Sequence, residues 1–237
     1  MKIENKITIV TAVKNGEAHI WELIESLNKQ KNNNIKWLVV DGGSTDNTLS
    51  IIESEIKIEY NIVKTKDFSI YHAFNIALEY VDTTYYIAAG ADDKFADNFS
   101  ELIADFIETE EYDLIIGGVQ KGDYIFFPSL NKEWFYGTDA PHSVGTITRC
   151  SLHNQFGKYS NLYPIAADRF FLKQVINSGA KYINIQHIFG YYSLDGMSTR
   201  LKIDSICDLF RIQMATNESF LVQLLLLTTR LLKTNFS

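Results

Sequence analysis

The sequence has little positive charge and few cysteines. Lys and Arg number 22 against 29 Asp and Glu, so the net charge is −7 and the isoelectric point is near 5.3. A nucleic-acid-binding protein shows a concentrated basic face, and this balance argues against such a partner. The two cysteines, Cys150 and Cys207, are too few and too far apart for a disulfide framework or a zinc cluster. Their scarcity suits the reducing cytoplasm.

Several motifs and segments are also absent from the sequence. It contains no G-x-G-x-x-G and no G-x-x-x-x-G-K-[ST], which argues against dinucleotide-binding and P-loop enzymes. No apolar signal segment precedes the first strand-like run, so we expect a cytoplasmic protein. The leucine-rich stretch from Phe220 to Leu232 is shorter than the ~20 residues that a membrane-spanning helix needs.

Strand-like and helix-like segments alternate through the first half. A chain of 237 residues with 46% hydrophobic content can bury the core of one main domain. We expect strands at 7–13, 37–40, 60–64 and 85–89, and helices at 19–30, 48–54, 71–81 and 99–108. This order predicts an α/β fold with right-handed crossovers and a mostly parallel central sheet covered by helices on both faces.

The regular alternation of predicted strands and helices ends after the acidic segment 108–113. We expect strands at 114–119, 124–127 and 182–188, a loop-rich region at 141–157, a helix at 168–177 and helical structure at 203–233. The sequence shows no internal repeat and no flexible linker. The two halves are therefore expected to share one compact body.

Carboxylates follow two of the predicted strands. One apolar run stops at Asp41 and opens into Gly42-Gly-Ser-Thr-Asp-Asn-Thr48, and another stops at Gly90-Ala-Asp-Asp93. Ligands of open α/β sheets bind beyond the carboxyl ends of the strands. The two segments together suggest a nucleotide site with a metal beside it.

Each of these residues also has a purely structural interpretation. The segment from Asp41 is a good turn and helix N-terminus, and Asp92 and Asp93 could cap the next helix. Asp168 could be an acid favoured by the helix dipole, and a lone loop histidine such as His142 is more often structural. The residue types alone leave these alternatives open.

The motifs taken together resemble family 2 glycosyltransferases of the GT-A fold. Four segments come in the order and spacing of that family, namely 11–17, 39–48, 66–75 and 90–93. Three later segments continue the resemblance, namely 141–143, 167–168 and 194–198. It covers roughly residues 5–200, with Gly90 and His72 standing where the family usually has polar or acidic residues.

The resemblance implies a GT-A-like, Rossmann-related α/β fold with C-terminal helices. We expect a glycosyltransferase domain at 1–200, with a nucleotide-binding half at about 1–118 and an acceptor half at about 119–200. A helical extension would occupy 201–237. That extension could pack on the domain, contact a second subunit, or lie at the inner face of the cytoplasmic membrane.

The resemblance also assigns roles to individual residues. Departure of a diphosphate builds negative charge that a divalent ion must stabilise, and Asp92 would hold Mg²⁺ or Mn²⁺ together with the phosphates. Asp168 would be the general base that takes the proton of the acceptor hydroxyl, with His142 on the acceptor side. Asp41 would accept from the uracil N–H. The remaining donor-site residues would be Thr11, Val13, Asp67, Asn75, Ala91 and Asp93.

The function implied is transfer of a hexose or N-acetylhexosamine, with inversion, from a UDP-sugar to a saccharide or lipid-linked saccharide in bacterial surface-polysaccharide, O-antigen or capsule assembly. An alternative is a nucleotidyltransferase or sugar-nucleotide pyrophosphorylase. Those enzymes usually carry a glycine-rich loop with Lys or Arg after the first strand, which segment 11–17 lacks. A catalytically degenerate scaffold is a second alternative, based on Gly90 and His72.

Overall fold

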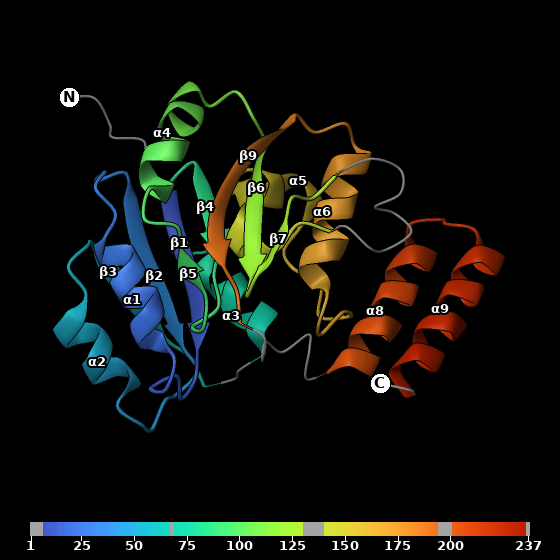
Figure 1. Ribbon diagram of the computed structural model, residues 1–237, viewed down its shortest axis with the longest axis horizontal. Helices are drawn as coiled ribbons and strands as arrows, with labels where there is room; N and C mark the ends of the chain where they lie inside the picture. The colour runs from blue at the N-terminus through green and yellow to red at the C-terminus, as the bar shows by residue number, and fades with distance from the viewer. Residues whose placement is uncertain (1–6, 67–68, 130–139, 194–200, 236–237) are drawn as a thin grey trace.

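The computed structural model describes residues 7–66, 69–129, 140–193 and 201–235 (Figure 1). The strands are β1 (Ile7–Val13), β2 (Ile35–Asp41), β3 (Tyr60–Lys64), β4 (Tyr85–Ala88), β5 (Lys94–Phe95), β6 (Leu114–Lys121), β7 (Tyr124–Phe126), β8 (Thr146–Arg149) and β9 (Tyr182–Tyr191). The helices are α1 (Ile20–Asn28), α2 (Thr48–Glu55), α3 (Ile70–Ala77), α4 (Phe99–Thr109), α5 (Leu152–Phe156), α6 (Ala167–Asn177), α8 (Lys202–Ala215) and α9 (Phe220–Asn235), with a single 3₁₀ turn, η2 (Ser143–Gly145), before β8.

One mixed sheet runs through the described residues in the order β3-β2-β1-β4-β8-β6-β9-β5, and β7 pairs with β6. Strands β3, β2, β1 and β4 are mutually parallel, whereas β8 is antiparallel to both of its neighbours. The chain proceeds from β1 outward to β2 and β3 and then returns to place β4 on the other side of β1. The point between β1 and β4 is therefore a topological switch point, where open α/β sheets bind ligands.

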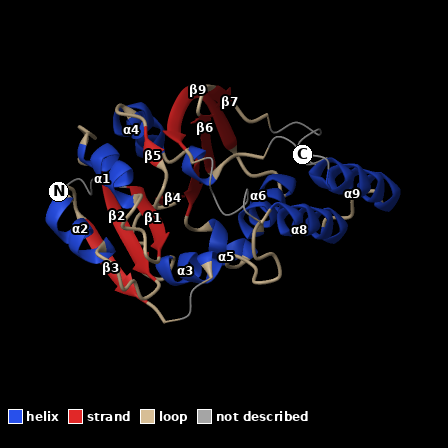
Figure 2. Ribbon diagram, turned by 60° about the horizontal axis from the view of Figure 1, so that its bottom comes forward, coloured by secondary structure: helices blue, strands red, loops and turns tan. Residues whose placement is uncertain are grey.

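Helices cover both faces of the sheet, as the alternation predicted (Figure 2). On one face α1, α2 and α4 pack over side chains such as Ile9 and Trp37, and on the other α3, α5 and α6 pack over Val10 and Leu38. The two faces alternate along each strand because successive side chains point in opposite directions. In β1, β2 and β4 the strand positions are mostly buried on both faces, as expected for the centre of such a sheet.

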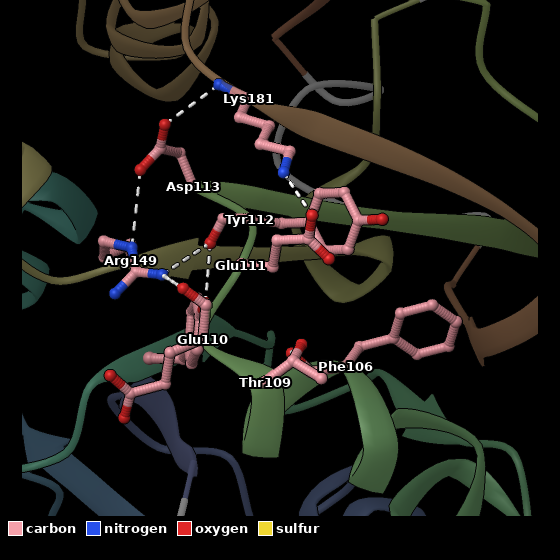
Figure 3. A network of polar contacts seen from close by, with 9 residues as sticks. Phe106, Thr109, Glu110, Glu111, Tyr112, Asp113, Arg149 and Lys181 are labelled. Carbon is pink, nitrogen blue, oxygen red and sulfur yellow. Dashed lines mark hydrogen bonds and ion pairs between the residues drawn. The ribbon is translucent and has the colours of Figure 1, made fainter.

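Strand β8 lies inside the region that the sequence predicted to be loop-rich. It has four residues, and its threonines, Thr146 and Thr148, obscure the apolar pattern although both are buried. Arg149 at its end forms an ion pair with Asp113 at 3.4 Å and donates to the main-chain carbonyl of Tyr112 at 3.0 Å (Figure 3). This anchor holds β8 between β4 and β6 and joins the two halves of the sheet.

The C-terminal helical region is an α8–α9 hairpin beside α6 (Figure 1). The helical structure expected at 203–233 consists of two helices, which are separated between Ala215 and Phe220, where Asn217 adopts a φ of 59°. Asp208 of α8 accepts from the Ile165 amide at 2.9 Å, and buried Lys173 of α6 pairs with Glu218 at 2.8 Å. Among the helices that the structure describes, none has the length and apolar character required to cross a bilayer.

Candidate active site

The loops after β1 and β2 are bonded to each other beyond the sheet edge. Asp41 is buried, and its carboxylate accepts from the amides of Gly43 at 3.1 Å and Ser44 at 3.1 Å. The adjoining loops are joined by Glu17, which accepts from the Asn47 amide at 3.0 Å and side chain at 2.9 Å. Those bonds lower the pKa of Glu17. Asp41 therefore closes the turn, as its structural interpretation predicted, at the edge where a base would lie.

Thr11 and Val13 place their side chains in the core. The Thr11 hydroxyl accepts from the indole N–H of Trp37 at 3.0 Å, and the Val13 carbonyl accepts from the Gly42 amide at 2.8 Å. Both side chains are buried. Because both side chains face the packed interior, Thr11 and Val13 present only their main chain at the sheet edge.

The turn after β4 is built around two carboxylates. The Gly90 amide donates to Asp93 Oδ2 at 2.7 Å, and a Cβ at position 90 would lie 2.7 Å from Asp92 Oδ1. Burial, with a smaller contribution from neighbouring Asp92, raises the pKa of Asp93 to about 7. The carboxylates of Asp92 and Asp93 thus lie close to Gly90, with half-buried Ala91 inside the same turn.

A cavity of about 250 Å³ brings together candidate residues from both halves of the chain. Asp92 and Asp93 line it from the turn after β4, Asp168 from the first turn of α6, and His142 from the segment before η2. Tyr71 of α3 lies in the same wall. The cavity opens on the α3 and α6 side of the sheet beside β4, next to the switch point.

The carboxylate of Asp168 is held through one of its two oxygens. Its Oδ1 accepts from the Tyr71 hydroxyl at 2.7 Å and from the Arg169 amide at 2.8 Å. Within the described ranges, Oδ2 has no hydrogen-bond partner. Burial first, and then the Asp168 charge, raise the pKa of Tyr71 well above its usual range, so the phenol stays a donor. The carboxylate is fixed, with one oxygen able to accept a proton from a substrate.

His142 is a neutral group in the cavity wall. Desolvation, with smaller contributions from Arg169 and Lys121, lowers the pKa of His142 to about 4. Its Nδ1 accepts from the Val144 amide at 3.3 Å, so the imidazole proton is on Nε2. The ring stacks on Tyr192 with the centroids 4.2 Å apart. His142 can donate a hydrogen bond but carries no charge near neutral pH.

Asn75 is not among the residues that line the cavity. It uses both ends of its amide on the main chain of Tyr159, at 2.8 Å each, and so joins α3 to the 159 segment. Its contact with a donor stays a prediction. Asp67 and the glycine/serine loop 194–198 lie outside the described residues.

Sequence reasoning did not identify the tyrosines of the cavity. Tyr71, Tyr86 and Tyr159 all line it, and the Tyr86 hydroxyl lies 2.6 Å from both Tyr159 Oη and His153 Nε2. Tyr71 falls within the motif segment 66–75, and that placement was the available signal. Nothing in the sequence around Tyr159 indicates that it meets β4.

The carboxylate of Asp92 suits a divalent metal ion whose other ligands come from a bound substrate. No cluster of three or more His, Cys, Asp or Glu side chains suited to a metal occurs in the part of the chain that the structure describes. Asp92 alone presents a carboxylate to both the cavity and the adjoining groove. A hard cation bound there needs further oxygen ligands, which the phosphates of a nucleotide can supply.

The geometry defines an α/β protein with a cavity lined by carboxylates at the switch point of its sheet. The family model for glycosyl transferase family 2 matches residues 8–189, and the chain belongs to that family. Helices α8 and α9 lie beyond the matched residues.

Solved structures share the GT-A-like fold. Residues 1–349 of Staphylococcus aureus TarS, in complex with UDP-GlcNAc, superpose with a TM-score of 0.71 at 20% identity, covering 95% of this chain and 71% of that one. The mannosyltransferase PcManGT from Pyrobaculum calidifontis, in complex with GDP-Man and Mn²⁺, gives a TM-score of 0.67 at 16% identity, covering 90% and 65%.

Two curated relatives illustrate the similarity in sequence. A PGL/p-HBAD biosynthesis glycosyltransferase of Mycobacterium bovis is 24% identical over 82% of this chain and 79% of its own length. A teichoic acid poly(glycerol phosphate) polymerase of Staphylococcus epidermidis is 33% identical over 39% of this chain. The match spans 13% of that polymerase.

Proposed function

We propose that the protein is an inverting glycosyltransferase that moves a hexose or N-acetylhexosamine from a UDP-sugar to a saccharide hydroxyl. The observation that supports this most is the convergence of Asp92 and Asp168 on one cavity beside the switch point, although 76 positions separate them. Asp92 comes from the nucleotide half and Asp168 from the acceptor half. Glycosyl transfer needs one group that stabilises the leaving group and one that activates the nucleophile, and these two carboxylates would supply them.

The chain's residues divide the reaction between them. Asp92 would hold Mn²⁺ or Mg²⁺ against the donor diphosphate, and the ion would stabilise the charge of the departing group. Asp168 Oδ2 takes the proton of the acceptor hydroxyl as its oxygen forms a bond to the anomeric carbon. The bond from that carbon to the diphosphate oxygen breaks on the opposite side, so the configuration inverts. The His142 Nε2–H would bind an acceptor oxygen.

The rival functions are less well supported. Family membership favours glycosyl transfer over a nucleotidyltransferase or pyrophosphorylase. The scaffold hypothesis relied partly on Gly90, but the carboxylate proposed to hold the metal, Asp92, still lines the cavity beside this glycine. The UDP specificity draws on the UDP-GlcNAc complex of TarS, and a GDP donor, as in PcManGT, is the direct competitor.

The cellular role follows the relatives' names and is part of the proposal. The names of the matched relatives include PGL/p-HBAD biosynthesis and teichoic acid, so we propose a bacterial surface-polysaccharide, O-antigen or capsule pathway with a saccharide or lipid-linked saccharide acceptor. The protein would work in the cytoplasm, with the α8–α9 hairpin available for contact with the inner membrane face or a second subunit.

Calorimetric titration tests the donor site. We expect UDP to bind in the presence of Mn²⁺ and more weakly without it, and GDP to bind less well. Asp92→Ala should abolish the metal dependence, because it removes the carboxylate that would hold the ion. Its control is Asp105→Ala, an exposed acid on α4. UDP affinity and metal dependence equal to wild type in Asp92→Ala would refute the assignment, and a thermal melt would separate that result from misfolding.

A further inference from the structure

A larger groove begins where the cavity ends. Its volume is about 860 Å³ against about 250 Å³ for the cavity, and the two share Asp92, Tyr192 and Ser193 in their walls. Helix α1 forms one wall, and β5 with the end of β9 forms the other. The groove is therefore a continuous extension of the site on the α1 side of the molecule.

The groove carries a net negative charge. Its lining includes four carboxylates and two lysines, namely Glu22, Glu25, Asp92, Asp97, Lys29 and Lys94. Lys94 lies 3.1 Å from Glu22 and Lys29 lies 3.1 Å from Glu25, so both cations are neutralised locally. An anionic chain entering here meets like charge, whereas sugar hydroxyls meet hydrogen-bond acceptors.

Tyr191, at the end of β9, provides an aromatic ring that is held in place. Lys94 Nζ lies over this ring, 5.7 Å from its centroid. The next residue, Tyr192, is stacked on His142 and has Lys121 Nζ 5.4 Å from its ring centroid, so both of its faces are occupied. Tyr191 can offer its second face to the C–H face of a sugar ring with little loss of side-chain entropy.

We propose that this groove binds the non-reacting units of an uncharged oligosaccharide acceptor. The proposal rests on the proposed function, because the reacting hydroxyl must reach Asp168 while the rest of the acceptor leaves the cavity. The groove begins at the shared residues Asp92 and Tyr192 and leads away from the reacting atoms. It selects against polyanionic acceptors, such as polyol-phosphate chains, through the surplus of carboxylates.

Saturation-transfer NMR on the full chain without nucleotide tests the groove alone. The neutral probes are cellotetraose and chitotetraose, and the anionic probes are tetragalacturonate and a glycerol-phosphate oligomer. We expect binding of a neutral probe and none of the anionic ones. Asp97→Lys should weaken binding of the neutral probe by about threefold and allow an anionic probe to bind, because the substitution reverses the sign of one charge in the groove. Tyr191→Ala should weaken the neutral probe by roughly three- to tenfold.

The matched control is Asp105→Lys, the same charge change on the exposed surface of α4. Equal behaviour of Asp97→Lys and Asp105→Lys, tighter binding of an anionic probe by wild type, or no binding of either neutral probe would overturn the proposal. Loss of UDP binding in Asp97→Lys would also overturn it, because the groove would then hold the donor. Failure of the proposed function is distinct, since it appears as absence of UDP binding to the wild-type protein.

Discussion

At the scale of single residues, the Tyr71 hydroxyl is placed to control how Asp168 works. It lies 2.7 Å from Asp168 Oδ1 and 2.9 Å from the Ile165 carbonyl, yet it has one proton to donate. The proton goes to Oδ1 while the carboxylate is charged, because charge-assisted bonds are the stronger ones. When Oδ2 gains a proton, the hydroxyl can turn to Ile165. Tyr71 thereby fixes which oxygen of Asp168 faces a substrate.

Two substitutions separate the roles of this pair. Asp168→Asn keeps the shape of the side chain and its helix-start bonds, so UDP binding should survive while transfer falls by ~10² to 10⁴. Tyr71→Phe should lower kcat by roughly tenfold, with KM for the donor unchanged, and move the acidic limb of the pH–rate profile to higher pH. A transfer rate of Asp168→Asn within a few-fold of wild type would show that Asp168 is not the base. If the pH–rate profile of Tyr71→Phe is the same as that of wild type, Tyr71 has only a packing role.

The surroundings of His153 lead us to expect that the stability of the folded protein depends on pH. Its Nδ1 donates to the Gly157 carbonyl at 2.9 Å and its Nε2 accepts from Tyr86, an arrangement that requires the neutral ring. Desolvation lowers the pKa of His153 to about 4, and that of His142 to about 4 as well. At these two histidines the unfolded chain therefore binds more protons below its usual histidine pKa of ~6.5, and their contribution to stability should fall as pH drops from there toward 4.

Urea unfolding at pH 7.5 and pH 5 measures this effect. His153→Gln should lower the midpoint at pH 7.5, because it breaks the Tyr86 contact, but should show a smaller drop between the two pH values than wild type. The control is His72→Gln, at a position where no bond to the imidazole is found within the described residues. A drop in His153→Gln as large as in wild type would contradict the assignment.

At the scale of elements, α9 presents an apolar face to solvent. Leu221, Leu225 and Leu232 are 76%, 65% and 58% exposed. The hydroxyls of Thr228 and Thr229 between them donate back to carbonyls of their own helix, which leaves their methyl groups to extend this face. No acidic residue occurs from Phe220 to Asn235, although the whole chain has a net charge of −7.

Leu225→Glu should leave UDP affinity and thermal stability close to wild type, because exposed substitutions change stability by about 0.5 kcal/mol or less. It should reduce co-sedimentation with vesicles that contain anionic lipid, since it places a charge in the apolar face. Leu162→Glu is the matched control, at 64% exposure in a loop outside α9. Equal vesicle binding by the two variants would contradict a lipid-facing role, and a concentration-dependent change in mass of Leu225→Glu alone would indicate a subunit contact instead.

At the scale of the whole molecule, the continuous sheet should make the chain unfold in one step. Strand β8 pairs with β4 on one side and with β6 on the other, so the sheet is continuous through the described residues. We expect tryptophan fluorescence, which senses buried Trp37, and far-ultraviolet circular dichroism to give the same urea midpoint. Separate midpoints would mean that the halves are independent folding units.

The sequence by itself determined the alternating strands and helices, the positions of Asp41, Asp92 and Asp168 at element ends, and the family, which the comparison confirmed. Those features depend on local periodicity and on short motifs. Tertiary structure decided the rest. Strand β8 was missed because four residues with two buried threonines give little apolar pattern, and the bonds of Asn75 to Tyr159 were not foreseen because the two residues are 84 positions apart. The Tyr71 bond to Asp168 and the acidic groove beside Asp92 likewise arise from segments that meet only when the sheet has closed.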